Sequence, residues 1–224
     1  MPKKPKPKKA IITADEFFKR RFKRLMSYLG YLVESERELY QRPKRLDVLV
    51  TKQPNSKAQL LHIFHYFQQF NLIAYKSFND RYSYDDVLNL IGDMTFFLRN
   101  TKEAQKENTT ATLILSQRPV RLLKEYAGND IDILEKGHYV FDVRVFKLHT
   151  LNIEEIDLKG VDGTFLLAFV KSKERIPAKI QSSKLYQRDQ NLFDILQETI
   201  HHRLAYFVED AGLPVKGSRN LWEQ

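Results

Sequence analysis

The sequence predicts a mixed α/β fold, and three observations lead to this prediction. Apolar residues recur at helical spacing in three long segments. Between these segments lie short apolar runs that are typical of buried strands. In chain order the elements are a helix, two strands, a helix, a strand, a helix, a strand-rich portion and a last helix. This order favours a sheet flanked by helices.

The composition is that of a globular protein without a membrane partner. The chain has 224 residues, of which 42% are hydrophobic and 29% are charged. Its longest uninterrupted apolar stretch, residues 165–170, is far too short to cross a bilayer. There are no cysteines, so no disulfides form, and a reducing cytoplasmic location is predicted.

A basic arm carries much of the charge. The net charge is +9. The first ten residues contain five lysines, so the rest of the chain carries +4. These lysines are Lys3, Lys4, Lys6, Lys8 and Lys9. Prolines at positions 2, 5 and 7 and the mutual repulsion of the lysines predict a disordered arm over residues 1–12. Nucleic acid, with DNA first, is the favoured partner. A tail that only aids solubility is the alternative.

The first half of the chain alternates helices and strands. Thr13 and Glu16 form a capping-box pattern that opens a helix expected to reach Val33. Strands are expected over 46–51 and 72–77, with a short helix or an extended segment over 58–70 between them. Ser83 caps a helix over 84–98. The basic flank of the first helix is a candidate phosphate-contacting surface, made of Lys19, Arg20, Lys23 and Arg24.

The second half is richer in strands. A buried strand is expected over 111–116, and Pro119 starts a short helix. Strands dominate from 131 to 170, with a hairpin at Asp162–Gly163 before a strand over 164–170. Asp189 caps a last helix that ends near Gly212 and Pro214. The predicted organisation is the arm (1–12), an α/β core (13–128), and a strand-rich extension with the last helix packed on that core (129–224).

Two charged residues stand out because they lie in apolar strands. Asp47 lies inside Leu46–Val50, and Lys76 lies near the end of the strand over 72–77. A lone charge is costly to bury, so each needs a partner, a metal or a chemical role. One interpretation is structural, with Asp47 paired to Arg45 or Lys76 and no metal present.

The sequence around Lys76 suggests a second interpretation. Residues 71–77, NLIAYKS, followed by Asp80 and a helix, resemble the PD-(D/E)XK nuclease superfamily, and within it a bacterial branch. The resemblance covers the chain from the first helix to Ser116. It implies a restriction-endonuclease-like mixed β-sheet flanked by helices, here with a strand-rich C-terminal extension and a final helix. The superfamily's proline before the first aspartate is Leu46 in this chain.

The resemblance implies a metal-dependent DNA endonuclease. Asp47 matches the first metal-binding aspartate, Lys76 matches the lysine, and the carbonyl of Tyr75 would complete a Mg²⁺ or Mn²⁺ site. Such a metal neutralises the charge that develops on the phosphate and activates a water, and the lysine orients that water. Ala74, however, occupies the position of the second acid.

Three explanations for Ala74 stay open. It is an engineered knockout, or the chain is a natural degenerate member that binds without cleaving, or the acid has moved to a neighbouring position: Asp80, Asp85, Asp86 or Asp93. The second explanation predicts an inactive module that binds nucleic acid or docks on a protein partner supplying specificity. A pure interaction scaffold is a further alternative. An acidic segment after the first helix, Glu34, Glu36 and Glu38, either adds a metal ligand or forms a solvated turn.

Overall fold

The computed structural model describes residues 13–38, 45–78, 80, 82–125, 131–143, 146–171 and 189–210. In chain order the elements are α1 (Ala14–Tyr28), β1 (Tyr31–Glu38), β2 (Arg45–Lys52), the 3₁₀ turn η1 (Ala58–Leu60), β3 (Phe70–Lys76), α2 (Tyr84–Asn100), β4 (Thr109–Leu115), α3 (Val120–Glu125), β5 (Ile131–Glu135), β6 (His138–Asp142), β7 (Lys147–Asn152), α4 (Gly160–Leu166), η2 (Leu167–Phe169) and α6 (Gln190–Asp210). The predicted α/β class is confirmed. The predicted arm and the predicted end of the last helix lie outside the described residues.

The seven strands form one open, mixed sheet in the order β1-β2-β3-β4-β7-β6-β5. Antiparallel pairing joins β1 to β2, β2 to β3, β7 to β6 and β6 to β5. The central strand β4 pairs in parallel with both of its neighbours, β3 on one side and β7 on the other. The strand-rich portion of the second half therefore extends the sheet of the first half.

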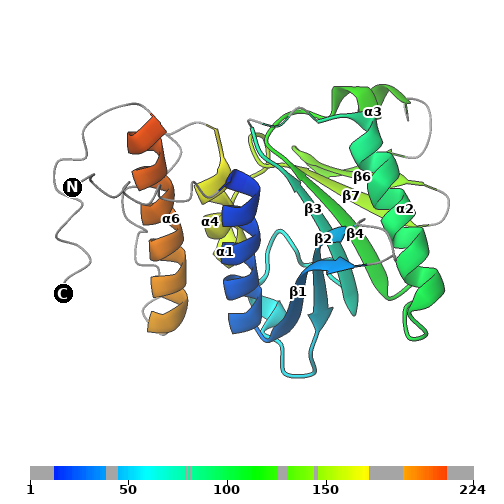
Figure 1. Ribbon diagram of the computed structural model, residues 1–224, viewed down its shortest axis with the longest axis horizontal. Coiled ribbons are helices and arrows are strands. Elements are labelled where there is room, and N and C mark those ends of the chain that lie inside the picture. The colour runs from blue at the N-terminus through cyan, green and yellow to red at the C-terminus, as the bar shows by residue number, and fades with distance from the viewer. Residues whose placement is uncertain are drawn as a thin grey trace, which may run out of the picture.

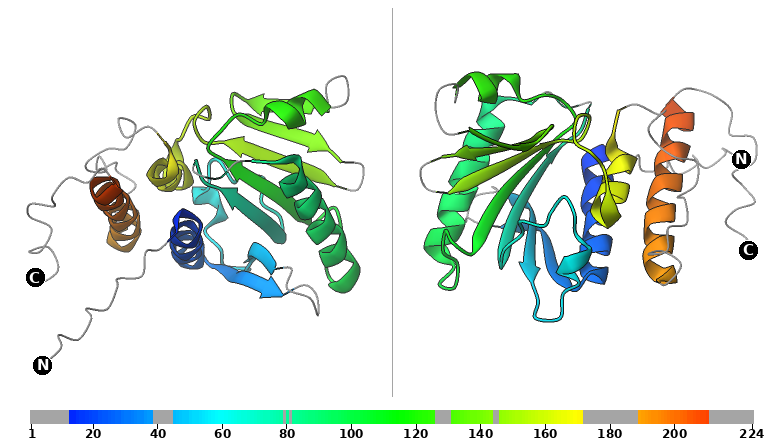
Figure 2. Two further views of the ribbon diagram at one scale, coloured as in Figure 1. Left: turned by 45° about the horizontal axis from the view of Figure 1, so that its top comes forward. Right: turned by 180° about the vertical axis from the view of Figure 1, so that it is seen from behind.

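Helices cover both faces of this sheet. Figures 1 and 2 show α2 against one face, α1 and α4 against the other, and α6 outside α1 and α4. One core cluster lies under α1 and α4, where the ring of Phe18 stacks on Tyr75 with centroids 4.1 Å apart. The other lies under α2. Strand β4 serves both, because Leu113 and Leu115 face α2 while Ile114 belongs to the opposite cluster.

The predicted helix starts are confirmed by their hydrogen bonds. The Thr13 hydroxyl accepts the amide of Glu16, 3.2 Å away, at the start of α1. At α2 the carboxylate of Asp86 accepts the amide of Ser83 at 2.8 Å. The Asp189 carboxylate accepts the amide of Leu192 at 3.2 Å at the start of α6. Each side chain satisfies backbone groups that a helix end leaves without partners.

The expectation that the first helix reaches Val33 is wrong. The helix ends at Tyr28, and Gly30 follows with φ +85°, a left-handed conformation that glycine adopts at low cost. Residues 31–38 then form strand β1, in which Tyr31 and Val33 are buried and Leu32 is exposed. This alternation is the period of a strand. The acidic segment therefore lies in an edge strand, and the predicted solvated turn is wrong.

A short helix over 58–70 is likewise wrong, apart from the single 3₁₀ turn of η1. The buried carboxylate of Asp162 accepts the amides of His62, at 3.0 Å, and Phe64, at 2.8 Å. Those amides are consequently unavailable to a helix within the segment. Phe64 and Phe67 stack at 4.8 Å and fill the core instead.

The predicted hairpin at Asp162–Gly163 and the strand over 164–170 are also wrong. These residues form α4 and η2. A Cβ atom on Gly163 would lie 2.4 Å from the carbonyl carbon of Leu158, so the glycine permits a close backbone contact and makes no turn. Asp162 faces the core, where it holds the 62–64 segment.

Candidate functional site

Asp47, Ala74 and Lys76 lie on adjacent antiparallel strands at one end of the sheet. In the β2–β3 register, Val48 pairs with Ile73 and Leu49 with Leu72. The next step of that register sets Asp47 across from Ala74. Because side chains alternate along a strand, Lys76 shares the face of Ala74. The structure therefore brings together the positions singled out in the sequence.

The ion-pair partner of Asp47 is a lysine of α1. Lys19 Nζ lies 3.3 Å from Asp47 Oδ1 and 2.8 Å from Asp15 Oδ2, and its side chain is only 13% exposed. Burial raises the pKa of Asp47 above its usual range, the nearby charge of Asp15 adds to this, and Lys19 opposes it. Burial would lower the pKa of Lys19, but the carboxylates of Asp15 and Asp47 outweigh burial and raise it. Of the two partners expected for Asp47, Lys76 pairs with Asp86 instead, and the side chain of Arg45 lies outside the described residues.

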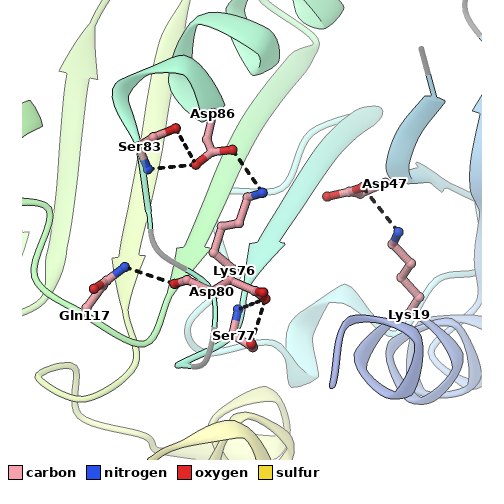
Figure 3. A network of polar contacts seen from close by, with 8 residues as sticks. All are labelled: Lys19, Asp47, Lys76, Ser77, Asp80, Ser83, Asp86 and Gln117. Atoms are coloured by element: carbon pink, nitrogen blue, oxygen red, sulfur yellow. Dashed lines mark hydrogen bonds and ion pairs between the residues drawn. The ribbon is translucent and has the colours of Figure 1, made fainter. Parts of the chain in front are cut away.

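Lys76 makes a separate ion pair with α2. Figure 3 shows its side chain directed at Asp86, and the Nζ–Oδ1 distance is 2.9 Å. Burial would lower the pKa of Lys76, but Asp86, and then Asp47 and Asp80, raise it above the ordinary value. Asp86 has a lowered pKa, since the Ser83 amide and Lys76 outweigh the effect of burial. The charges of Asp47 and Lys76 thus affect each other's pKa, although each residue makes its ion pair with a different partner.

The four acids considered as replacements for the missing carboxylate lie in the turn after β3 or on α2. Asp80 accepts hydrogen bonds from the amide of Ser77, at 3.3 Å, and from its hydroxyl, at 2.7 Å, which closes the turn after β3. Asp86 caps α2 and pairs with Lys76. Asp85 is exposed on α2, and Asp93 lies two turns further along that helix.

With Lys19 in place, these donors do not fit a divalent cation. Magnesium requires several oxygen ligands in near-octahedral geometry. Ala74 offers none, and the carboxylate of Asp47 is bound to an ammonium group. Across the described ranges, no three His, Asp or Glu side chains are grouped so that they could hold a metal ion. The carbonyl of Tyr75 belongs to a strand paired on both sides and stays a predicted ligand only.

The basic flank of α1 is largely engaged in ion pairs. Arg20 pairs with Glu16 yet is 63% exposed, and Lys19 is directed inward to Asp47. On the side facing α6, Glu198 pairs with Arg24 and with Arg21, the latter at 3.2 Å. Lys23 is exposed. Contact with phosphates stays a prediction for Arg20, Lys23 and Arg24. Lys19 is not on the exposed flank, because its side chain reaches Asp47.

A buried polar cluster was missed in the sequence. His138 Nε2 on β6 and His149 Nδ1 on β7 are 3.0 Å apart, and the ring of Tyr66 stacks on His149 with centroids 3.7 Å apart. The Tyr66 hydroxyl lies 3.1 Å from Thr112 Oγ1. Burial lowers the pKa of His138 to about 4, with the charge of His65 adding to the effect. Both faces of β6 and β7 are buried, so the alternation of side chains along these strands did not single out the two histidines.

Comparison with known proteins gives no further assignment: no family model, no curated protein and no solved structure matches this chain. In the part of the chain that the structure describes, the helices are too short or too polar to span a membrane. The interpretation of the site therefore depends on its own geometry.

Proposed function

We propose that this chain is a nuclease-like module that binds nucleic acid, DNA first, and does not cleave it in its present form. One observation carries the proposal. The β2–β3 register sets Asp47 across from Ala74, with Lys76 two residues on, and this arrangement supports a PD-(D/E)XK-type frame that lacks its second acid. The order of the elements also supports a restriction-endonuclease-like arrangement. Helix α1 is followed by the antiparallel strands β1, β2 and β3, then by α2 and by β4, which is parallel to β3.

The charge distribution supports a polyanionic partner. The chain carries +9, and the exposed side of α1 presents Arg20 and Lys23. Lysine and arginine contacts to phosphates release counterions, which makes such binding weaken steeply with salt. The same contacts carry no sequence information, so specificity would come from another surface or from a protein partner.

The binding test is a titration of labelled single-stranded and double-stranded DNA and RNA, followed by fluorescence anisotropy between about 50 and 200 mM salt. We expect the logarithm of the affinity to fall linearly with the logarithm of the salt concentration. Replacing the five arm lysines by glutamine should make that slope shallower by up to about 4.5, at about 0.9 per phosphate contact. No binding at the lowest salt, or binding that does not depend on salt, would refute the proposal.

The endonuclease hypothesis is the second candidate, because position 74 lies where a second carboxylate would face Asp47. Its test is nicking of plasmid DNA in Mg²⁺ or Mn²⁺ by an Ala74→Glu variant, alone and combined with a Lys19 substitution, since Lys19 neutralises Asp47. The unchanged chain should be slower by about 10³-fold or more. If no restored variant cleaves any DNA or RNA tested, the hypothesis fails. The natural gene's codon 74 separates an engineered alanine from a natural one.

A further inference from the structure

The ammonium group of Lys19 lies between two carboxylates from different elements. Asp15 precedes it by one turn of α1, and Asp47 comes from β2. The distances from Lys19 Nζ are 2.8 Å and 3.3 Å, which are those of charge-assisted hydrogen bonds and ion pairs. A lysine side chain that is 13% exposed in this position joins the first helix to the sheet.

The charges explain why an ammonium group is sufficient at this position. Two carboxylates that share one cation repel each other in its absence, and a single positive charge relieves most of that repulsion. Lys76 supplies nothing further to this pair by direct contact, because its ion pair is with Asp86. A glutamate at 74 would add one more negative charge beside Asp47, and a divalent cation would then be the better counterion.

We propose that the Lys19 ammonium group takes the place of a divalent cation at Asp47, so that this centre is held together without a metal. The inference rests on the nuclease-like frame of the proposed function and does not depend on nucleic-acid binding. The loss of a carboxylate at 74 and the inward lysine at 19 then form a matched pair of features. Restoring the carboxylate alone does not restore a cation site, because Lys19 still occupies it.

The first test asks whether a divalent cation can replace the ammonium group. Lys19→Met keeps the unbranched chain, one atom shorter, and removes its charge. Lys23→Met is the control because Lys23 is exposed on the same helix. We expect Lys19→Met to lower the thermal unfolding midpoint by about 2–4 °C. About 10 mM Mn²⁺ should return at least half of that loss by binding the folded state. Unchanged chain and Lys23→Met should show no Mn²⁺ effect.

Two outcomes of this test would overturn the proposal. One is a Lys19→Met midpoint that does not respond to Mn²⁺. The other is a Mn²⁺ response of the same size in the unchanged chain, which would mean that the cation and Lys19 occupy different positions.

The second test measures Mn²⁺ binding directly, by the electron paramagnetic resonance signal of the free ion. We expect Ala74→Glu to bind Mn²⁺ no more tightly than the unchanged chain, and the double variant Ala74→Glu, Lys19→Met to bind at least about tenfold more tightly. Tight binding by Ala74→Glu with Lys19 in place would refute the proposal even if the double variant failed to fold. Equal affinities of the single and double variants would refute it as well.

Discussion

The buried histidine pair predicts how the stability of the protein depends on pH. Burial lowers the pKa of His138 to about 4 and that of His149 to about 3, from an ordinary value of 6.5. The charge of His138, and then those of His65 and Lys147, add to the effect at His149. The side chain of His138 is fully buried and that of His149 is 8% exposed, so neither imidazolium is solvated in the folded state.

The direction follows from which state binds protons. Below pH 6.5 the unfolded chain protonates both histidines, whereas the folded protein keeps them neutral until the pH approaches 4. Their contribution to stability is therefore complete above about pH 6.5 and is lost as the pH falls. Each group changes the free energy of unfolding by about 1.4 kcal/mol per pH unit. Since the two rings share a hydrogen bond and titrate together, we expect a loss of about 2–4 kcal/mol between about pH 6.5 and 5.

The assay is urea denaturation at several pH values, followed by circular dichroism. The double variant His138→Leu, His149→Leu removes both titrating groups and both hydrogen-bonding partners, so it leaves no polar group unpaired within the pair. We expect its stability to vary with pH by about 2–4 kcal/mol less than that of the unchanged protein over this range. His201→Gln, at an exposed position of α6, is the control and should retain the full pH dependence. The same pH dependence in the double variant and the unchanged protein would refute the reasoning.

Three further predictions concern single carboxylates. Asp162→Ala should lower the free energy of unfolding by about 2–4 kcal/mol in urea denaturation, because it leaves the buried amide of Phe64 and the partly buried amide of His62 without their acceptor. Asp157→Asn, a change at an exposed position, should have little effect. Asp189→Ala removes the N-cap of α6 and should cost about 1 kcal/mol in the same assay; a loss below about 0.3 kcal/mol would contradict that role. If the proposed function is right, Glu198→Gln should raise nucleic-acid affinity about three- to tenfold at low salt by releasing two arginines, while Asp194→Asn, with the same charge change on α6, should not. Equal effects of the last two variants would show that only net charge matters.

The elements predicted from the sequence were those with strong local signals. The capped helix α2 and the apolar strands β2, β3 and β4 carry their pattern within a single segment, so chain order and periodicity suffice. Strand β1 was missed because Leu29 and Leu32 continue the helical spacing of apolar residues beyond the end of α1. The glycine at position 30 was the local sign that the helix ends there. The segment 61–67 takes its shape from the Asp162 carboxylate, about a hundred residues away in the chain, which no local pattern reports.

The candidate site shows the same limit at the level of side chains. The sequence placed Asp47 and Lys76 in neighbouring strands and identified position 74 as the missing acid. It did not predict their partners, because Lys19 and Asp86 come from two helices on opposite faces of the sheet. Lys19 instead looked like part of an exposed basic flank, since helical spacing alone does not show which neighbour a long side chain reaches.

The position of β4 affects how the chain can fold and be divided. All seven of its residues are buried, and its backbone pairs in parallel with β3 and β7. Parallel pairing needs a long crossover, so both neighbours reach β4 only through contacts distant in sequence, which slows folding. A polypeptide ending at residue 128 would keep β4 but lack β7. It would expose an apolar edge strand, the kind of surface that pairs with other chains and aggregates.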